Sequence, residues 1–446
     1  MEKEQQAPQQ NKPFRVIVVG GGLVAITAAH ILSKADIDFV ILEQHDNLTP
    51  WIGSLLDVML PILNDLEDYQ TINADDGSPI HLISGVGNMW ARNHGYGIGV
   101  TSRPQFVNAL YECLPESAKA RIHVKKRVTE IDVLPDGVCV HCEDGTTEEG
   151  TIVIGADGVH SRTRQCMETL ASGKREEKVD QDAESPYLTT YRALIGNLPE
   201  IPDLKPCYNY QGVRYGLSPQ LVTGEGRGWF YVYEALEEPT RRRRRYTEQD
   251  KQDMMNKYAD MHVAPGYQLR DLYALNVGDI GLINVEEGRV DHWTWGGRIA
   301  LVGDAVRKLD PHAGLGYNSG VADIVELVNR LRHLLHSKEV QNSTGVPSAD
   351  RLQTAFDEYE ETRKWSERNV HIVSRMSARS SAWLNWGHQF ISTSVMRVFP
   401  VVRWMLDYLV APVVARAPVI EWLEETELPQ GASRWLHHPL QNAGDE

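Results

Sequence analysis

The stretch 14–43, FRVIVVGGGLVAITAAHILSKADIDFVILE, decides the fold. Its first residues, 14–19, are apolar and mostly β-branched, which is typical of a strand buried on both faces. Three glycines follow at once, a helix is predicted over 23–34, and the apolar run 38–42 ends on Glu43. The pattern predicts a strand–helix–strand unit of a parallel α/β sheet.

The glycine turn has the G-x-G-x-x-G/A spacing, formed by Gly20, Gly22 and Ala25. Gly20 permits the tight turn, Gly22 lets a pyrophosphate approach the backbone, and Ala25 lets the helix pack closely on the strand. The start of the helix offers free N–H groups to phosphates, and Glu43 can accept hydrogen bonds from a ribose diol. A glycine triplet alone could be an ordinary turn, but with both strands, the helix and the acid it predicts dinucleotide binding.

The bulk composition is that of a globular protein. Of the 446 residues, 42% are hydrophobic and 24% charged, as in soluble domains. The formal net charge of −16 argues against binding to nucleic acid or to an anionic surface. The five cysteines imply no disulfide framework, and the C-x-x-C pair Cys139 and Cys142 has no second ligand pair, so no metal site is predicted. No run of 18 apolar residues would span a membrane, and we expect a cytoplasmic protein.

Two later strand ends also carry an acid. The apolar run 151–155 leads into Asp157 and Gly158, and the run 298–302 leads into Asp304. Taken alone, Asp157 and its glycine would form a plain turn. A second glycine turn, Gly314-Leu315-Gly316-Tyr317, then opens another apolar-periodic helix.

Three other segments are ambiguous. Arg103 begins a predicted helix and could be a surface residue or a cofactor contact. The five arginines of 241–245 favour a solvated loop over a phosphate or partner site. The tryptophan-rich segment 381–423 is interrupted by charges and is therefore amphipathic. Core packing or a dimer face is favoured there over membrane contact, which would be peripheral.

Together the three acid-bearing segments resemble the group A FAD-dependent monooxygenases related to p-hydroxybenzoate hydroxylase. The resemblance covers about residues 14–379. The phrases VVGGGLVAITAAHIL, VIGADGVHSRTR and INVEEGRVDHWTWGGRIALVGD are most similar to a fungal branch that acts on indole-diterpenes, meroterpenoids and indole alkaloids. The family implies FAD, NADPH and molecular oxygen, with the oxygen transferred from a C4a-hydroperoxyflavin.

The resemblance also implies the architecture. We expect an α/β protein with a Rossmann-type FAD-binding domain, an interleaved mixed β-sheet substrate domain and a C-terminal helical region. A loop followed by a helix is expected over 49–67, and a surface link over 172–186. The expected division is a disordered tail at 1–13, the FAD-binding domain at 14–186 and 280–379 with part of the substrate sheet from about 69–100, the substrate domain at 187–279, and the helical region at 380–446.

The family's binding roles transfer by position. Glu43 would bind the adenosine ribose and Val128 would offer its backbone to adenine. Arg103 would contact the flavin chain, and Asp304 would bind the ribityl hydroxyls or the pyrophosphate. Asp157 would lie near the cofactor phosphates and the nicotinamide approach. The backbone of Gly314, Leu315, Gly316 and Tyr317 would face the N1–C2=O edge of the flavin.

On the substrate side, Arg192 would act as an acid or orienting group, with Tyr215 as a weaker candidate on the facing sheet. The resemblance therefore implies an FAD- and NADPH-dependent monooxygenase that epoxidises or hydroxylates a hydrophobic polycyclic natural product, an indole alkaloid or terpenoid. The oligomeric state and the exact substrate stay open.

The sequence departs from the family near the flavin ring. Arg307 replaces the usual histidine, Leu315 a glutamine and Ala322 a glutamate, while Asp310-Pro311-His312 replaces Thr-Pro-Asn. These departures motivate an alternative, a protein of the same fold that binds FAD but acts as a non-redox cyclase or isomerase. A third hypothesis is a binding protein without turnover.

Overall fold

The strand predicted at the start of the chain lies at the centre of a six-stranded sheet. The computed structural model describes residues 13–48, 54–57, 64–173, 184–342, 345–424 and 429–438. The sheet has the order β20-β21-β12-β1-β2-β8, and its central pairings are parallel, as the strand–helix–strand pattern predicts. Its strands are β1 (Arg15–Val19), β2 (Asp38–Leu42), β8 (Ile122–His123), β12 (Ile152–Gly155), β20 (Thr294–Trp295) and β21 (Ile299–Leu301).

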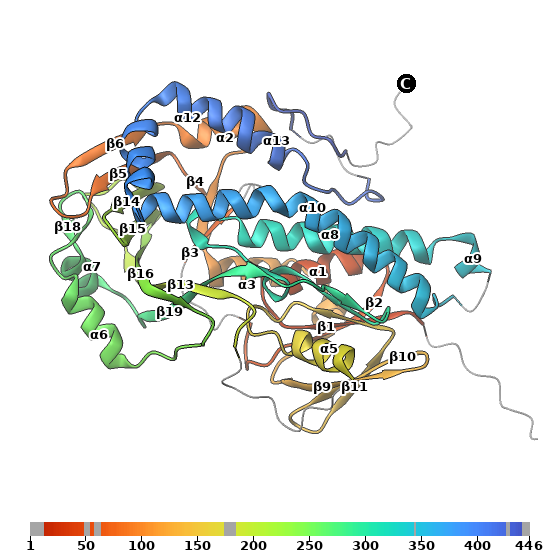
Figure 1. The fold of residues 1–446 in the computed structure, drawn as a ribbon. Helices are drawn as coiled ribbons and strands as arrows, with labels where there is room; N and C mark the ends of the chain where they lie inside the picture. The colour runs from red at the N-terminus through yellow and green to blue at the C-terminus, as the bar shows by residue number, and fades with distance from the viewer. Residues whose placement is uncertain are drawn as a thin grey trace, which may run out of the picture.

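Helices cover one face of this sheet, and a three-stranded sheet with one helix covers the other (Figure 1). The helices of the first face are α1 (Leu23–Lys34), α3 (Arg103–Glu112), α4 (Glu116–Lys119), α8 (Gly316–Leu335), α9 (Lys338–Gln341) and α10 (Ala349–Ser381). The other layer consists of β9 (Val128–Leu134), β10 (Gly137–Cys142), β11 (Thr147–Gly150) and α5 (Arg162–Ser172). The sheet is apolar on both faces and forms the largest core of the molecule.

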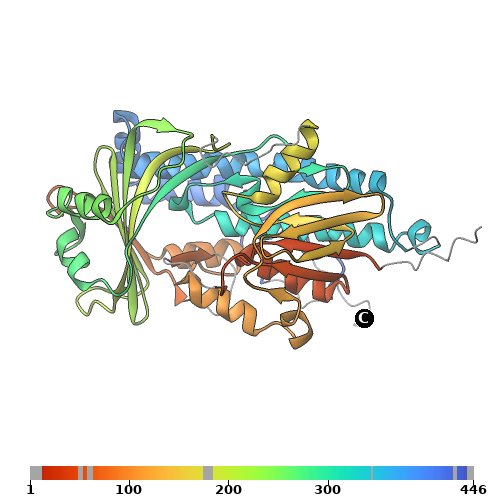
Figure 2. The same ribbon diagram turned by 90° about the horizontal axis from the view of Figure 1, so that it is seen from below.

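A second, eight-stranded mixed sheet lies beside the first, and α10 runs past both (Figure 2). Its order is β22-β19-β13-β16-β15-β14-β5-β6, and only β14 and β5 pair in parallel. The strands are β5 (Asp68–Asn73), β6 (Pro79–Ile83), β13 (Leu188–Pro199), β14 (Tyr208–Val213), β15 (Leu217–Gly224), β16 (Arg227–Thr240), β19 (Gly281–Arg289) and β22 (Arg307–Lys308).

Both faces of the second sheet are covered. One apolar cluster joins it to α6 (Glu248–Lys257), α7 (Leu269–Leu275), β17 (His262–Ala264) and β18 (Tyr267–Gln268). A separate cluster joins its other face to β7 (Gly99–Ser102) and the end of α10. The structure differs from the sequence expectations at two places. The FAD-binding domain is expected to include residues 281–289, but these form β19, which pairs with β13 of the second sheet. A helix is expected within 49–67, but the residues described there form β3 (Ser54–Asp57) and β4 (Asn64–Asp65), which both pair with β7.

The C-terminal region packs on α2 (Val86–His94) through Val86, Met89 and Val402. Its helices are α11 (Trp386–Phe390), α12 (Phe399–Met405) and α13 (Ala411–Val414), with π-helical turns η3 (Ile391–Val395) and η4 (Leu406–Val410) between them. Among the described residues, no helix is long and apolar enough to cross a membrane and no acid, histidine and cysteine cluster could hold a metal. All five cysteines are free thiols. The expected tail, apart from residue 13, and the central part of the expected link lie outside the described residues.

Candidate functional site

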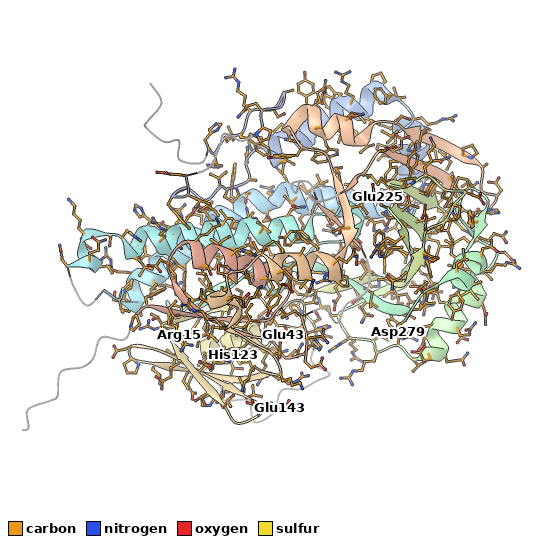
Figure 3. The ribbon with its side chains drawn as sticks, turned by 180° about the vertical axis from the view of Figure 1, so that it is seen from behind. Arg15, Glu43, His123, Glu143, Glu225 and Asp279 are labelled. Carbon is orange, nitrogen blue, oxygen red and sulfur yellow. The ribbon has the colours of Figure 1, made fainter. Side chains whose placement is uncertain are left out.

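The glycine turn and Glu43 meet at the carboxyl ends of β1 and β2. Gly20 has φ +105°, and a Cβ added there would lie 2.6 Å from the Ala156 carbonyl oxygen, so only glycine fits. Glu43 is buried at the tip of β2, near His123 (Figure 3). Its Oε2 accepts a hydrogen bond from the Gly21 amide at 2.5 Å and its Oε1 one from the His45 amide at 2.7 Å. The backbone therefore holds the carboxylate in place beside the turn.

The N-terminus of α1 has open space beside it among the described residues. Within that part of the chain, a Cβ added at Gly22 would have no heavy atom within 4 Å and no side chain caps the helix. Ala25 is fully buried against the sheet, as its small size allows. The first N–H groups of α1 are thus free to bind an anion, and the empty space beside Gly22 fits a pyrophosphate.

Val128 opens β9 and is buried. The chain before it pairs with the loop after β2, because the Lys126 amide donates to the Glu43 carbonyl at 2.7 Å and the Lys125 amide to the His45 carbonyl at 2.8 Å. This pairing brings the Val128 backbone close to the end of β2, where an adenosine bound by Glu43 would lie.

Asp157 holds the start of α5. Its carboxylate accepts hydrogen bonds from Ser161 Oγ at 2.6 Å and from the Thr163 amide and hydroxyl at 2.9 and 3.0 Å. Ser161 Oγ accepts in turn from the Arg164 amide at 2.9 Å and caps the helix. Gly158 has φ +76° and an open Cβ position. The carboxylate of Asp157 is thus engaged by the protein itself, and a contact with the cofactor phosphates stays a prediction.

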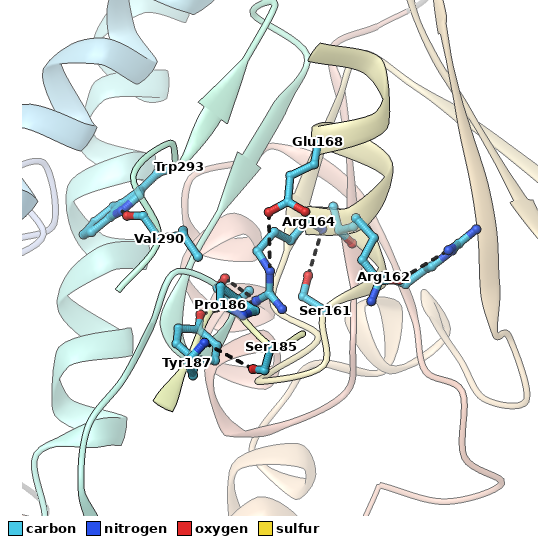
Figure 4. Close-up of polar contacts among 12 residues, drawn as sticks. Ser161, Arg162, Arg164, Glu168, Ser185, Pro186, Tyr187, Val290 and Trp293 are labelled. Carbon is cyan, nitrogen blue, oxygen red and sulfur yellow. Dashed lines mark hydrogen bonds and ion pairs between the residues drawn. The ribbon is translucent and has the colours of Figure 1, made fainter. Parts of the chain in front are cut away.

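Arg164 and Tyr187 connect this turn to the Asp304 segment, and sequence reasoning missed both. Figure 4 shows the two side chains beside Ser161 and Ser185. The buried Arg164 guanidinium donates to the Val159 carbonyl and to the Ala305 carbonyl, each at 2.8 Å. The Tyr187 hydroxyl donates to the Asp304 carbonyl at 3.0 Å. The S-R-T-R run that follows the Asp-Gly turn could have indicated these contacts. An arginine in the first turn of a capped helix can reach back toward the ends of the neighbouring strands.

Arg103 and Asp304 lie within electrostatic reach of each other, although 201 residues separate them. Burial lowers the pKa of Arg103, and the negative charge of Asp304 partly offsets that effect. Asp304 belongs to the 3₁₀ turn η1 (Gly303–Ala305), and its carboxylate accepts from Lys308 Nζ at 2.5 Å. The structure therefore brings these two predicted site residues together.

The second glycine turn opens α8 after the 3₁₀ turn η2 (Pro311–Ala313). Gly314 has φ +64°, and a Cβ added at Gly316 would meet nothing within 4 Å. Leu315 occupies the cap position and no side chain caps the helix. The Tyr317 hydroxyl lies 3.0 Å from Thr27 Oγ1, so this side chain points toward α1. As far as the described residues show, the half-buried N-terminus of α8 at Gly316, rather than the Tyr317 ring, has open space beside it.

Arg192 does not point toward the expected substrate side of the second sheet. Its Nε donates to Glu234 Oε2 at 2.5 Å, and Glu234 Oε1 accepts from Lys257 Nζ and the Tyr258 hydroxyl, each at 2.6 Å. Those partners belong to α6 and the residue after it, on the outer face of the sheet. Tyr191, the preceding residue, packs in the cluster that faces β7 and α10. Because side chains alternate along a strand, Arg192 points away from the nucleotide-binding half of the molecule.

The position expected for Tyr215 is wrong as well. Tyr215 lies in the turn between β14 and β15 and is 55% exposed. Its hydroxyl bonds to Gln389, and its ring packs edge-on against Trp383 at 5.7 Å. Tyr215 therefore attaches the sheet to the C-terminal region instead of facing a substrate.

Arg307 belongs to a buried ion-pair network. Its guanidinium lies 2.7 Å from Asp323 Oδ2 and 2.8 Å from Glu367 Oε2. Arg363 binds the same two acids, with Nε 2.8 Å from Asp323 Oδ1. Burial favours the neutral form of Arg307, but the two carboxylates raise its pKa above the ordinary value. This departure from the family pattern therefore joins β22, α8 and α10.

The comparisons with known proteins agree with this geometry. Residues 98–343 match the model of the FAD binding domain family, and residues 18–58 match a model of an NAD(P)-binding Rossmann-like domain. Among solved structures, HpxO of Klebsiella pneumoniae in complex with FAD and uric acid superposes with a TM-score of 0.69 at 18% identity over 89% of this chain and 97% of its own. A salicylate hydroxylase substrate complex gives a TM-score of 0.63 at 17% identity over 92% and 100% of the two chains.

Curated relatives extend over nearly the whole chain. The FAD-dependent monooxygenase srdH of Neurospora crassa is 31% identical over 426 residues, which cover 90% of each protein. The FAD-dependent monooxygenase prhF of Penicillium brasilianum is 28% identical over 89% of this chain and 84% of its own. The glycine turn, the two open helix N-termini and these matches lead to one conclusion: this chain belongs to the FAD-dependent monooxygenases.

Proposed function

We propose that this enzyme uses NADPH and oxygen to epoxidise or hydroxylate a hydrophobic polycyclic natural product, an indole alkaloid or terpenoid, in a secondary-metabolite pathway. The observation that supports this most is the pair of helix N-termini without a side-chain cap, at Gly22 and Gly316; Gly303, next to Asp304, lies against Val24 of α1 and Gly320 of α8. Bound FAD would supply the electron transfer from NADPH and the activation of oxygen. The balanced reaction consumes NADPH, a proton and O₂, and it yields the oxygenated product, NADP⁺ and water.

The chain's own residues would bind and orient the cofactor. Glu43 would accept hydrogen bonds from the adenosine ribose, and the N-terminus of α1 would bind the pyrophosphate. Arg103 and Asp304 would hold the polar chain between the phosphates and the ring. The N-terminus of α8 would stabilise negative charge at the ring edge through its N–H groups and dipole.

The inner face of the second sheet supports a hydrophobic substrate. Tyr191, Trp229, Tyr231 and Tyr233 pack in one buried cluster on this face, and the Tyr231 and Tyr233 rings stack with centroids 5.9 Å apart. An aromatic lining of this kind would suit a polycyclic apolar compound and would exclude water from the reacting atoms.

A cationic group beside the Asp157 turn suits the phosphates of NADPH. Burial, together with the charges of Arg243, Arg164 and Lys308, lowers the pKa of His160 to about 4. Arg243 belongs to the five-arginine run and lies near His160, so that run reaches this turn. We expect Arg243→Ala to raise the KM for NADPH about tenfold, as loss of one charge-assisted phosphate contact would. Arg242→Ala, a neighbouring exposed arginine, is the control.

The non-redox alternative is weakened at one point. Arg307, which motivated it, pairs with Asp323 and Glu367 inside the protein and does not add a new group at the flavin. Leu315 and Ala322 remain as departures without a structural account. The discriminating experiment measures NADPH oxidation by the purified yellow protein with candidate indole and terpenoid substrates. Substrate-dependent NADPH oxidation supports the proposal, whereas substrate conversion without NADPH supports a cyclase or isomerase.

The C-terminal region supports a peripheral contact with a lipid bilayer. Of the twenty large hydrophobic side chains that are exposed among the described residues, eight lie within 384–409, including Trp386, Trp404 and Tyr408. The whole chain, with a net charge of −16, is unsuited to an anionic surface, but this segment carries Arg397 and Arg403 against the single acid Asp407 and is therefore locally basic. Exposed aromatic rings with arginines suit the interface of an anionic bilayer, and an apolar substrate would concentrate there.

A further inference from the structure

A buried hydrogen-bonded chain links the turn before α8 to the second sheet. Asp310 Oδ1 accepts from the His312 amide at 3.0 Å and lies 2.5 Å from His312 Nδ1. On the other side of the ring, His312 Nε2 lies 3.1 Å from Ser218 Oγ in β15. The side chains of Asp310 and His312 are each 1% exposed, and Ser218 is fully buried.

The chain continues across the sheet in one direction. Gln211 Nε2 donates to Ser218 Oγ at 2.7 Å, and the Tyr69 hydroxyl donates to Gln211 Oε1 at 3.2 Å. Because Ser218 already accepts from Gln211, its own proton is free to point toward His312 Nε2. A neutral imidazole would then donate from Nδ1 to Asp310 Oδ1, so that each link of the chain joins one donor to one acceptor.

The ring of His312 is also held by packing. The Tyr233 ring lies 4.1 Å and the Tyr191 ring 6.2 Å from it, centroid to centroid. Ser374 Oγ in α10 donates to the Asp310 carbonyl at 3.1 Å. The turn 310–316 is therefore attached both to the sheet and to α10 through buried contacts.

We propose that His312 is a positioning residue that fixes this turn, and with it the N-terminus of α8, at a set distance from the inner face of the second sheet. It acts through the backbone of 314–316 and not by contact with reacting atoms. This inference rests on the proposed function for its catalytic consequence, because the flavin edge would lie at that N-terminus and the substrate on that sheet. A misplaced turn would let reduced flavin react with oxygen without oxygenating the substrate.

The first test needs no turnover. Ser218→Ala removes the link to the sheet and leaves the turn itself intact, and Thr223→Val removes another buried hydroxyl from the same strand. Amide hydrogen exchange of the FAD-loaded proteins should be at least about fivefold faster across 310–318 in the Ser218 variant, as loss of one buried hydrogen bond predicts, and unchanged there in the Thr223 variant. Equal exchange in both variants overturns the proposal.

The second test measures product formed per NADPH consumed. His312→Gln keeps a polar group facing Ser218 and should retain at least about half of the wild-type ratio, whereas His312→Leu removes both links and should lower it about tenfold. A wild-type ratio in the His312→Leu protein overturns the catalytic role. If no variant, including the wild type, oxidises NADPH with any substrate, the proposed function fails, and the exchange experiment still decides the role of His312 in holding the turn.

Discussion

Replacing Arg307 by methionine should destabilise the protein severely while leaving its flavin chemistry intact. The four residues of this buried network are each no more than 5% exposed: Arg307, Arg363, Asp323 and Glu367. The two positive charges of the arginines balance the two negative charges of the acids. The Arg307→Met variant would leave two buried carboxylates facing one guanidinium. Breaking a buried pair in this way costs about 3–5 kcal/mol, because a charge is left without compensation.

Chemical denaturation of the FAD-loaded protein, followed by tryptophan fluorescence, measures this loss. Arg351→Met is the matched control, because Arg351 pairs with Glu339 at 2.5 Å while its side chain is 40% exposed, and such a pair contributes about 1 kcal/mol or less. The double variant Arg307→Met with Glu367→Met restores neutrality and should recover much of the stability. Equal stability of the Arg307 and Arg351 variants would refute the network, and a changed flavin spectrum in a fully stable Arg307 variant would place Arg307 at the flavin.

Three further predictions concern the cofactor, the surface and pH. Glu43→Gln should weaken FAD binding about tenfold in a fluorescence titration, since it loses a charge-assisted contact, and unchanged affinity would exclude Glu43 from the ribose site. Trp404→Ser with Tyr408→Ser should reduce sedimentation with phosphatidylserine vesicles, whereas Trp365→Ser should not; equal binding, or loss of a dimer instead, would contradict the bilayer contact. Burial lowers the pKa of His94 from 6.5 to about 4. Between these pH values the unfolded chain binds a proton that the folded protein does not, so the folded state loses stability as the pH drops from 6.5 toward 4. His94→Gln should make thermal stability less dependent on pH in that range.

Local sequence patterns correctly predicted the strand–helix–strand unit of β1, α1 and β2 that carries the proposed nucleotide site. The glycine turn, α1 and Glu43 lie within 30 residues, and their spacing alone brings them together. The proximity of Arg103 and Asp304 could be predicted only through the family resemblance, because only the tertiary fold closes a gap of 201 residues. The FAD-binding class followed from the order of these segments along the chain.

The substrate side was predicted poorly for a physical reason. Both faces of β13 are covered, so its apolar pattern does not tell which face holds Tyr191 and which holds Arg192. An irregularity in pairing between Thr189 and Tyr191 shifts the register as well. The orientation and role of the Arg307 and His312 side chains depend on partners far along the chain. These partners, Glu367 and Ser218, cannot be inferred from local periodicity.

The proposed function requires this chain to transfer one oxygen atom from O₂ to its substrate at the expense of NADPH. The most direct measurement supplies ¹⁸O₂ to the FAD-loaded enzyme with NADPH and a candidate polycyclic substrate, and it follows the product by mass spectrometry. We expect one ¹⁸O atom in the product and no product when NADPH or oxygen is withheld. A product formed without either of them, or one that carries no label from ¹⁸O₂, would contradict it.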